Sequence, residues 1–387
     1  MKKLMYAVIL MLLVNFIPVG VFAEDNSVKL VPNAVSSVLM DAESGKIIFE
    51  KDMNKKVAVA SMTKMVAQII ILEKIEDGKI KWDDVVTVSK NAADMGGSQI
   101  YISEGEKITI EDLMKGISMA SGNDATVAMA EVISGSEKKF VKLMNDKVKQ
   151  LGLKNTQFKN CTGLDEDGHY SSAYDMAIIA RELIVNHPEI FRFSSVYEDY
   201  LRENTEDKFW LVNTNKLVRF YEGADGLKTG HTDNAGYCLA ATAKRNGLRL
   251  IGIVLGESSA AVRNSETMDL LDYGFQNLKV TTLKNKGEVV KKIKLDKADS
   301  EIVDIVLMDD LSITQAVDDE LGNYDYKIKV NDIKLPIKVG DIVGKIYVYD
   351  NDKKIKEGKL TISKDIKSLG FFKLLRNELI DLISGEF

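Results

Sequence analysis

Two polar side chains interrupt a strongly apolar stretch of the chain. Ser61 and Lys64 lie within VAVASMTKMVAQIIIL, at 57–72. The apolar spacing predicts a buried helix, and a separation of three residues puts the hydroxyl and the amine on one helical face. A serine hydroxyl becomes a good nucleophile when a base takes its proton, and burial favours the neutral lysine that can be this base. The pair therefore indicates a serine nucleophile activated by a lysine.

Two further triplets contain residue types that suit the same chemistry. The first, SGN, contains Ser121 and Asn123 and falls at a break between two predicted helices. Its side chains are placed to relay a proton and to bind a substrate amide. The second, KTG, is predicted on an edge strand, where Lys228 and Thr229 suit a carboxylate. Gly230 would leave room for a substrate to lie along the backbone.

The spacing S-x-x-K by itself carries little information, because about one such match arises by chance in a chain of this length. Ser136 and Lys139 form a second match, at a polar helix start that follows a glycine, so a helix N-cap explains it. Ser89 begins an S-x-N match that we interpret as an ordinary surface feature. The apolar surroundings of Ser61 and Lys64 distinguish that pair from both.

Composition excludes several other classes of function. The chain has 387 residues and a formal net charge of −6, which argues against nucleic acid as a general partner. Its three histidines, His169, His187 and His231, belong to no H-E-x-x-H motif, so we expect no metal site. No G-x-S-x-G elbow supports a Ser-His-Asp enzyme. Cys161 and Cys238 are interpreted as two buried thiols, and a disulfide between them lacks support.

The elements that must position these residues predict an α+β unit. A strand at 35–40 and a second from Lys46 form a hairpin, and Asn246-Gly247 marks a second hairpin further along. Helical segments lie between the two hairpins, and TMDLLDYGFQNLK closes the unit as a helix. We expect the terminal strands to meet in one antiparallel sheet flanked by helices.

Four segments are expected along the chain. Residues 1–23 read as a signal peptide cleaved after Ala23, with an uncleaved membrane anchor as the alternative. Loss of its two lysines would take the formal net charge from −6 to −8. Residues 24–279 form the catalytic domain, and 280–365 a small all-β domain. The protein is therefore expected to be exported and to work outside the cytoplasmic membrane.

The last segment, 366–387, is predicted to be an amphipathic helix. One stripe of this helix is apolar and consists of Phe371, Phe372, Leu375, Leu379, Leu382 and Ile383. A helix packed on the β domain is one interpretation, and a helix lying in the outer face of the cytoplasmic membrane is the other. The segment lacks the basic excess expected of a strong anchor.

Long stretches of the chain resemble the low-molecular-mass penicillin-binding proteins that are serine-type D-alanyl-D-alanine carboxypeptidases. They include ASMTKM, GGSQIYISEGEKITIEDLMKGISMASGNDA, TGLDEDGHYSSAYDMA and GADGLKTGHTDNAGYCLAATAKRNGLRLIGIVLG. The resemblance covers almost everything after the signal peptide. It implies a fold like that of penicillin-binding proteins and β-lactamases, followed by the small all-β domain and the terminal helix.

The resemblance also implies roles in catalysis. Ser61 would be the acylated nucleophile and Lys64 its base, with Ser121 assisting proton transfer at the border of the cleft. The backbone amides of Ser61 and His231 would form the oxyanion hole. No metal or organic cofactor is implied.

For substrate binding, the resemblance implies that Lys228 and Thr229 hold the terminal carboxylate of the substrate, with Arg263 near it. The surroundings of Arg263 differ from the family pattern. Asn123 would border the cleft with Ser121.

The expected reaction is removal of the terminal D-alanine from peptidoglycan pentapeptide stems, and β-lactam antibiotics should acylate Ser61. D,D-endopeptidase or transpeptidase activity is the nearest alternative, because the same acyl-enzyme can pass to other acceptors. A β-lactamase would need a deacylating base that is not evident in the sequence. A β-lactam-sensing binding module would usually follow transmembrane helices, and none is predicted after residue 23.

Overall fold

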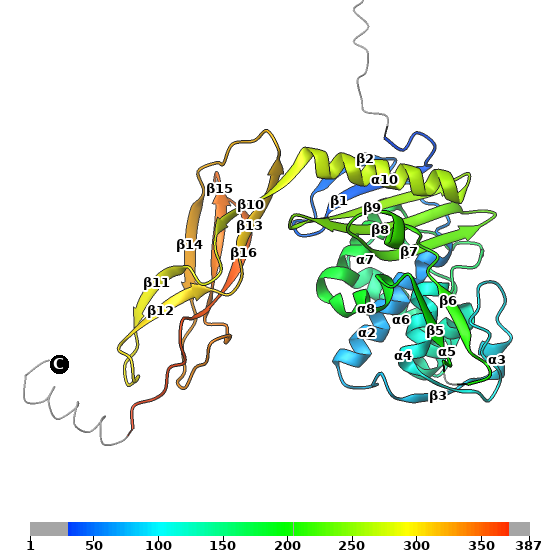
Figure 1. The fold of residues 1–387 in the computed structure, drawn as a ribbon, viewed down its shortest axis with the longest axis horizontal. Helices are drawn as coiled ribbons and strands as arrows, with labels where there is room; N and C mark the ends of the chain where they lie inside the picture. Colours follow the sequence, from blue (N-terminus) through cyan, green and yellow to red (C-terminus); the bar gives the residue numbers. More distant parts are fainter. Residues whose placement is uncertain (1–29, 204, 371–387) are drawn as a thin grey trace, which may run out of the picture.

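The computed structural model describes residues 30–203 and 205–370. The predicted signal segment and 371–387 of the predicted terminal helix lie outside these residues. The prediction of a helix at 366–370 is wrong, because Ile366 and Ser368 instead form bridges with Ile337 and Ala298 of the all-β unit. Figure 1 shows an α+β unit and a smaller all-β unit, joined where helix α10 (Ala260–Asn277) runs directly into strand β10 (Leu278–Lys284). This arrangement confirms the predicted fold class for the described part of the chain.

The α+β unit is built on one five-stranded antiparallel sheet in the order β2-β1-β9-β8-β7. As predicted, strands from the two ends of the unit meet, because β1 pairs with β9. The β8–β9 turn contains Asn246 and Gly247, both with positive φ, as a tight hairpin requires. The strands are β1 Ser36–Asp41, β2 Ile47–Lys51, β7 Ala224–Thr232, β8 Gly236–Arg245 and β9 Leu248–Glu257.

The two faces of this sheet bury two separate cores. Alternate side chains point to opposite faces of a strand, so Leu39 packs beneath α10 while Val38 and Met40 face the other helices. Figure 1 shows α10 along one face of the sheet and helices α2 to α8 on the other. The helices on that other face are α2 Lys64–Glu76, α3 Lys90–Ala93, α4 Ile110–Lys115, α5 Asn123–Ser134, α6 Glu137–Gln150, α7 Ala173–Asn186 and α8 Phe191–Ser194. Leu217 of the short helix α9 (Leu217–Phe220) packs in the same core as α10.

Short elements complete the α+β unit. Two small antiparallel sheets of two strands each pair β3 (Val85–Thr87) with β4 (Lys107–Thr109), and β5 (Glu198–Leu201) with β6 (Phe209–Val212). Cys161 and Cys238 are buried free thiols, as predicted. Among the helices of the described residues, none has the length and apolar character needed to cross a membrane.

The all-β unit packs a five-stranded antiparallel sheet against the pair β10–β13. Its core contains Ile305, Ile346 and Leu360 from three neighbouring strands. The side chain of Lys356 in this unit forms an ion pair with Glu43 in the β1–β2 turn. The strands are β11 Val289–Lys294, β12 Ile302–Leu307, β13 Leu311–Ala316, β14 Asp325–Val330, β15 Gly344–Asp350 and β16 Lys353–Ile362.

Candidate active site

The predicted pair lies where an apolar helix begins. Ser61 is in a 3₁₀ turn, Ala60–Thr63, and Lys64 is the first residue of α2. The predicted single helix therefore starts as a tighter turn, in which residues three apart are eclipsed. Consistent with this geometry, Lys64 Nζ lies 2.8 Å from Ser61 Oγ.

Two further hydrogen-bond acceptors surround the amine of Lys64, and they determine where its lone pair points when the amine is neutral. Lys64 Nζ donates to Asn123 Oδ1 at 2.6 Å and to the Thr162 carbonyl at 2.7 Å. Asn123 Nδ2 donates to the Gly96 carbonyl at 2.7 Å, which fixes the amide with its oxygen toward the lysine. A neutral amine has two N–H groups, and these two acceptors use both of them. Its lone pair is then left for the hydroxyl of Ser61.

Burial favours this neutral form. The side chain of Lys64 is fully buried, and loss of hydration lowers the pKa of its amine to about 7. Cys161 and the carboxylate of Asp124 act in the opposite direction but do not offset burial. The structure therefore provides a lysine that can accept a proton near neutral pH.

The Thr162 carbonyl reaches this site because of an adjacent glycine. A Cβ on Gly163 would lie 2.0 Å from the carbonyl oxygen of Ala60, which immediately precedes the nucleophile. Gly163 also has a φ of +86°, and Ala60 has an unusual φ of +46°. The main chain at 162–163 therefore packs directly on the turn that carries Ser61, and sequence reasoning about side chains missed this contribution.

The predicted helix break is confirmed, but its hydroxyl is not bonded to the lysine. A π-helical turn, Gly116–Ala120, is followed by Ser121 in the left-handed conformation, with φ of +63°. Such backbone strain in a non-glycine residue often marks a functional site. Ser121 Oγ is buried and has no hydrogen-bond partner among the described residues. Asn123, and not Ser121, contacts the amine of Lys64.

Strand β7 brings the third triplet to the same site. Lys228 is buried, and burial, with Lys64 and Arg263 as further causes, holds the pKa of its amine well below the usual range. Thr229 Oγ1 donates to Thr214 Oγ1 at 2.8 Å. β7 is an edge strand, as predicted, and an edge strand can pair with an extended peptide.

The structure shows a packing reason for a glycine at position 230. A Cβ at this position would lie 2.6 Å from the carbonyl oxygen of Val59 and 3.2 Å from the Cβ of Ala60. The glycine thus allows β7 to approach the turn that precedes the nucleophile. The predicted room for a substrate along the backbone stays a prediction.

A third buried basic side chain, Arg263, comes from α10. Only 5% of Arg263 is exposed, and burial lowers the pKa of its guanidinium. Arg263 donates to the side chain of Asn264, and Lys228 donates to the Thr229 carbonyl. Within residues 30–203 and 205–370 neither side chain has a carboxylate partner. Buried cations without counter-ions favour the binding of an anion. His231 is exposed, with its ring 4.0 Å from that of Tyr237.

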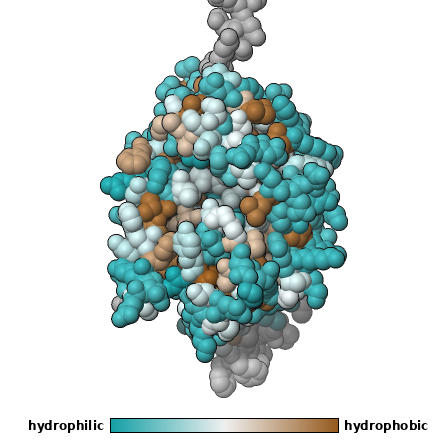
Figure 2. All heavy atoms as spheres, turned by 90° about the vertical axis from the view of Figure 1, so that its right-hand side faces the viewer, coloured by the Kyte–Doolittle hydropathy of each residue, from teal (hydrophilic) through white to brown (hydrophobic). Residues whose placement is uncertain are grey.

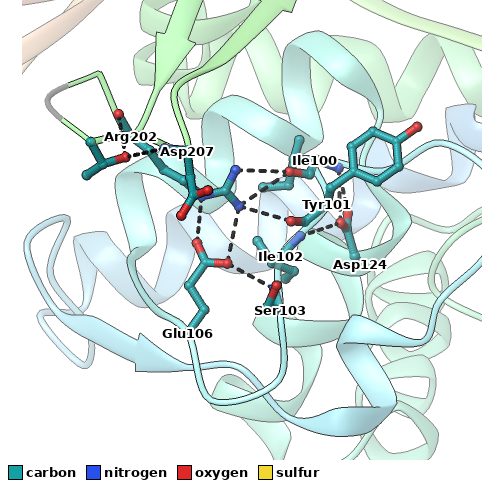
Figure 3. A network of polar contacts seen from close by, with 9 residues as sticks. Ile100, Tyr101, Ile102, Ser103, Glu106, Asp124, Arg202 and Asp207 are labelled. Atoms are coloured by element: carbon teal, nitrogen blue, oxygen red, sulfur yellow. Dashed lines mark hydrogen bonds and ion pairs between the residues drawn. The ribbon is translucent and has the colours of Figure 1, made fainter.

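A second layer holds the loop that orients Asn123. Asp124 accepts from the backbone N–H groups of Ile100 and Ile102, at 3.0 and 3.3 Å. Figure 3 shows the guanidinium of Arg202 between Glu106 and the carbonyls of the same loop. The Nε of Arg202 lies 2.7 Å from Glu106 Oε1. These contacts hold the loop that contains the Gly96 carbonyl.

The surface of the α+β unit is predominantly hydrophilic on the face shown in Figure 2. Its hydrophobic residues form separate small patches and no continuous apolar surface. This face therefore lacks the large apolar area typical of stable protein–protein interfaces.

Across the described residues, no group of three or more His, Cys, Asp or Glu side chains is arranged to hold a metal ion.

Two family models match the chain and divide it as the fold does. One, described as D-alanyl-D-alanine carboxypeptidase, matches residues 25–259. The other, described as Penicillin-binding protein 5, C-terminal domain, matches residues 279–368. The D-alanyl-D-alanine carboxypeptidase DacF of Bacillus subtilis (strain 168) is 42% identical over 385 residues, which span 98% of this chain and 99% of DacF.

Solved structures are similar over most of the chain or over its larger part. Penicillin binding protein 5 from Haemophilus influenzae has a TM-score of 0.66 and 32% identity, and the match covers 87% of this chain and 98% of that protein. Penicillin-Binding Protein D2 from Listeria monocytogenes, solved in its ampicillin-bound form, has a TM-score of 0.57 and 31% identity. That match covers 63% of this chain and 98% of the Listeria protein.

Proposed function

The chain belongs to the D-alanyl-D-alanine carboxypeptidase family and is a serine-type D,D-carboxypeptidase, and we propose that Ser61 carries its acyl-enzyme. One observation supports this assignment above the others. The amine of Lys64 lies 2.8 Å from the hydroxyl of Ser61 and donates its other two hydrogen bonds to oxygen atoms of Asn123 and Thr162. A neutral lysine in this position can take the hydroxyl proton.

Acylation follows from this geometry. Ser61 Oγ attacks the carbonyl carbon of the penultimate D-alanine, and its proton passes to the amine of Lys64. The backbone N–H groups of Ser61 and His231 are proposed to stabilise the oxyanion that forms. The C–N bond then breaks, the leaving amine takes up a proton, and D-alanine departs. Ser121, whose buried hydroxyl is unpartnered, is proposed to pass that proton.

Hydrolysis of the ester completes the cycle. A water molecule attacks the carbonyl carbon of the acyl-enzyme, and its proton passes to the amine of Lys64. The bond to Ser61 Oγ breaks, and the hydroxyl is restored as Lys64 returns a proton. The products are free D-alanine and a stem shortened by one residue.

The cationic end of the site is proposed to select the free carboxylate of the substrate. Lys228 and Arg263 are buried basic groups for which no carboxylate partner is found in the described part of the chain, and Thr229 offers a hydroxyl next to Lys228. The substrate would lie along the edge of β7, with its amide near Asn123. An acidic group lowers the free energy of this pocket because it supplies the missing counter-ion.

The family binds peptidoglycan stem peptides and β-lactams. The ampicillin-bound Listeria structure is an example of β-lactam binding. We infer that a β-lactam acylates Ser61 of this chain, because its reactive amide meets the same nucleophile. We also propose that the protein is exported by residues 1–23 and held at the outer face of the membrane by its C-terminal segment. The charged and apolar pattern of these two segments supports that proposal.

The test is a product analysis with purified protein lacking residues 1–23. Incubation with a soluble pentapeptide stem should release one D-alanine and leave a tetrapeptide. A parallel reaction with an added amine acceptor measures transfer against hydrolysis. Absence of D-alanine release from a folded protein would contradict the proposed site, and a cross-linked main product would assign the transpeptidase alternative.

A further inference from the structure

The five-stranded sheet of the all-β unit differs in charge from the rest of the protein. Its strands carry ten lysines against four carboxylates, whereas the whole chain has a formal net charge of −6. Positive charge is therefore concentrated on one element. The position of the lysines within the sheet shows where it is exposed.

Strand register places three lysines side by side. Lys329 of β14 is directly opposite Lys345 of β15, which is directly opposite Lys359 of β16. We call these three residues the lysine row. All three are exposed, whereas their neighbours Ile346 and Leu360 point into the core, so the row lies on the face away from the core.

This arrangement opposes folding and so calls for another explanation. Like charges directly opposite one another on adjacent strands destabilise a sheet. An ion pair with Glu357, at 2.7 Å, offsets the charge of Lys345. Lys329 and Lys359 have no carboxylate within ion-pair distance in the described residues. Two of the three charges are therefore available to an external anion.

Two tyrosine rings lie on the same face, next to the row. Tyr347 is directly opposite Lys327 and is followed, two residues on, by Tyr349. The amine of Lys327 lies 4.6 Å from the centre of the Tyr349 ring, and that of Lys354 lies 5.4 Å from the centre of the Tyr347 ring. These contacts hold the rings and extend the basic surface around them. The face thus combines flat rings with a line of cations.

We propose that this face binds the peptidoglycan polymer itself, at a second site separate from the catalytic cleft. The inference rests on the proposed function, which makes peptidoglycan stems the substrate. The stems of that polymer carry carboxylates that can pair with lysines, and its sugar rings can pack on tyrosine rings. The protein is acidic overall, so an anionic polymer would be repelled by most of its surface. The lysine row supplies local attraction, and the rings of Tyr347 and Tyr349 provide flat surfaces for sugars.

The test is co-sedimentation with insoluble peptidoglycan from which covalently attached phosphate polymers have been removed. The variant changes the row to Lys329→Gln, Lys345→Gln and Lys359→Gln. We expect about a tenfold weaker apparent affinity at low salt, a difference that shrinks as salt is raised. The control changes three exposed lysines of the other unit, Lys107→Gln, Lys138→Gln and Lys154→Gln, and should bind like the wild type.

Two further measurements separate this proposal from its alternatives. D-alanine release from a soluble pentapeptide should be the same in all three proteins, because the row lies outside the cleft; if that release is absent even in the wild type, the proposed function fails instead. The thermal midpoint of the row variant should not fall, because like charges have been removed. Equal sedimentation of both variants would overturn the proposal. So would binding that needs the phosphate polymers, or that is found only with vesicles containing anionic lipid.

Discussion

At the scale of the residue, two serines stand three positions before a lysine, and their surroundings give them different functions. Ser136 is the N-cap of α6, where its side chain accepts from the N–H of Lys139. Ser61 instead faces the buried amine of Lys64. The identical spacing thus provides a matched internal control.

We predict that Ser61→Ala abolishes both D-alanine release and covalent labelling by penicillin. Ser136→Ala should leave both near the wild-type level and cost about 1 kcal/mol of stability through the lost cap. Labelling by a fluorescent penicillin, followed on a denaturing gel, checks the first result. Retained labelling in Ser61→Ala would move the nucleophile to another residue.

The lysine pKa predicts how acylation depends on pH. With the amine of Lys64 titrating at about 7, the rate of acylation by penicillin should rise through neutral pH as the base loses its proton. The measurement is a stopped-flow rate between pH 5 and 9. A rate that stays constant across this range, with no loss on the acid side, would contradict the role of the lysine as base.

The same shift predicts a change in stability, and its sign follows from proton binding. Between pH 7 and about 10.4 the unfolded lysine is protonated and the folded one is not, so the free energy of unfolding rises with pH. Below pH 7 the full penalty of burying the charge remains. Lys64→Met should therefore stabilise the protein most at pH 6, and the gain measured by denaturant unfolding should shrink toward pH 10. A gain independent of pH would indicate improved packing alone.

Lys228 allows a test of carboxylate recognition. Lys228→Ala should weaken acylation by peptides with a free C-terminal carboxylate, because a buried cation would be lost from the pocket. Amidation of that carboxylate should then reduce kcat/KM of the wild type far more than that of the variant. The four kcat/KM values form a double-mutant cycle, and equal losses in both proteins would show that the two groups do not interact.

At the scale of the element, the active site depends on how closely segments of the main chain approach one another. The segment at 162–163 supplies a carbonyl to Lys64, and Gly163 permits its contact with the turn at Ala60. Gly230 likewise permits strand β7 to approach the main chain at Val59, just before the same turn. Two glycines thus help to position the reacting side chains, because they let segments of the main chain approach one another closely.

We predict that Gly163→Ala removes activity, because its Cβ would overlap the Ala60 carbonyl and displace the turn that carries Ser61. Gly152→Ala is the matched control, since Gly152 also has positive φ, +71°, but has no atom within 4 Å of an added Cβ. That control should lose about 1 kcal/mol of stability and keep its activity. Comparable activity in both variants would show that the close approach is not required. Circular dichroism should confirm that both fold.

At the scale of the whole molecule, the chain joins a catalytic unit to a basic sheet and then to a segment outside the described residues. The last described residues belong to the all-β unit, because Ser368 forms a bridge with Ala298 and the N–H of Leu369 donates to the Lys297 carbonyl at 2.7 Å. A deletion that tests membrane attachment should therefore begin after Gly370.

We predict that deletion of 371–387 moves the protein from the membrane fraction to the soluble fraction without lowering D-alanine release. The segment has two basic residues against three acidic ones, so its attachment should rest on apolar burial and respond weakly to salt. Fractionation in low and high salt checks this. Loss of activity or of thermal stability on deletion would instead assign the segment to the fold.

The sequence alone determined the elements that depend on local patterns. Apolar spacing located the buried helix after Ser61, and Asn-Gly located the β8–β9 hairpin. The helix break at Ser121 and the edge position of Lys228 were also predicted correctly. Resemblance over long stretches identified the family. These features are readable because helix period, turn chemistry and motif spacing are properties of neighbouring residues.

Only the tertiary structure decided which groups meet and how they titrate. The Thr162 carbonyl at the amine of Lys64 had no side-chain signal, and the need for Gly163 and Gly230 depends on backbone from distant segments. The lysine row likewise appears only when strand register is known. The lowered pKa of Lys64 has the same origin. A sequence lists the ionisable groups, but burial by residues far along the chain determines the free energy of charging them.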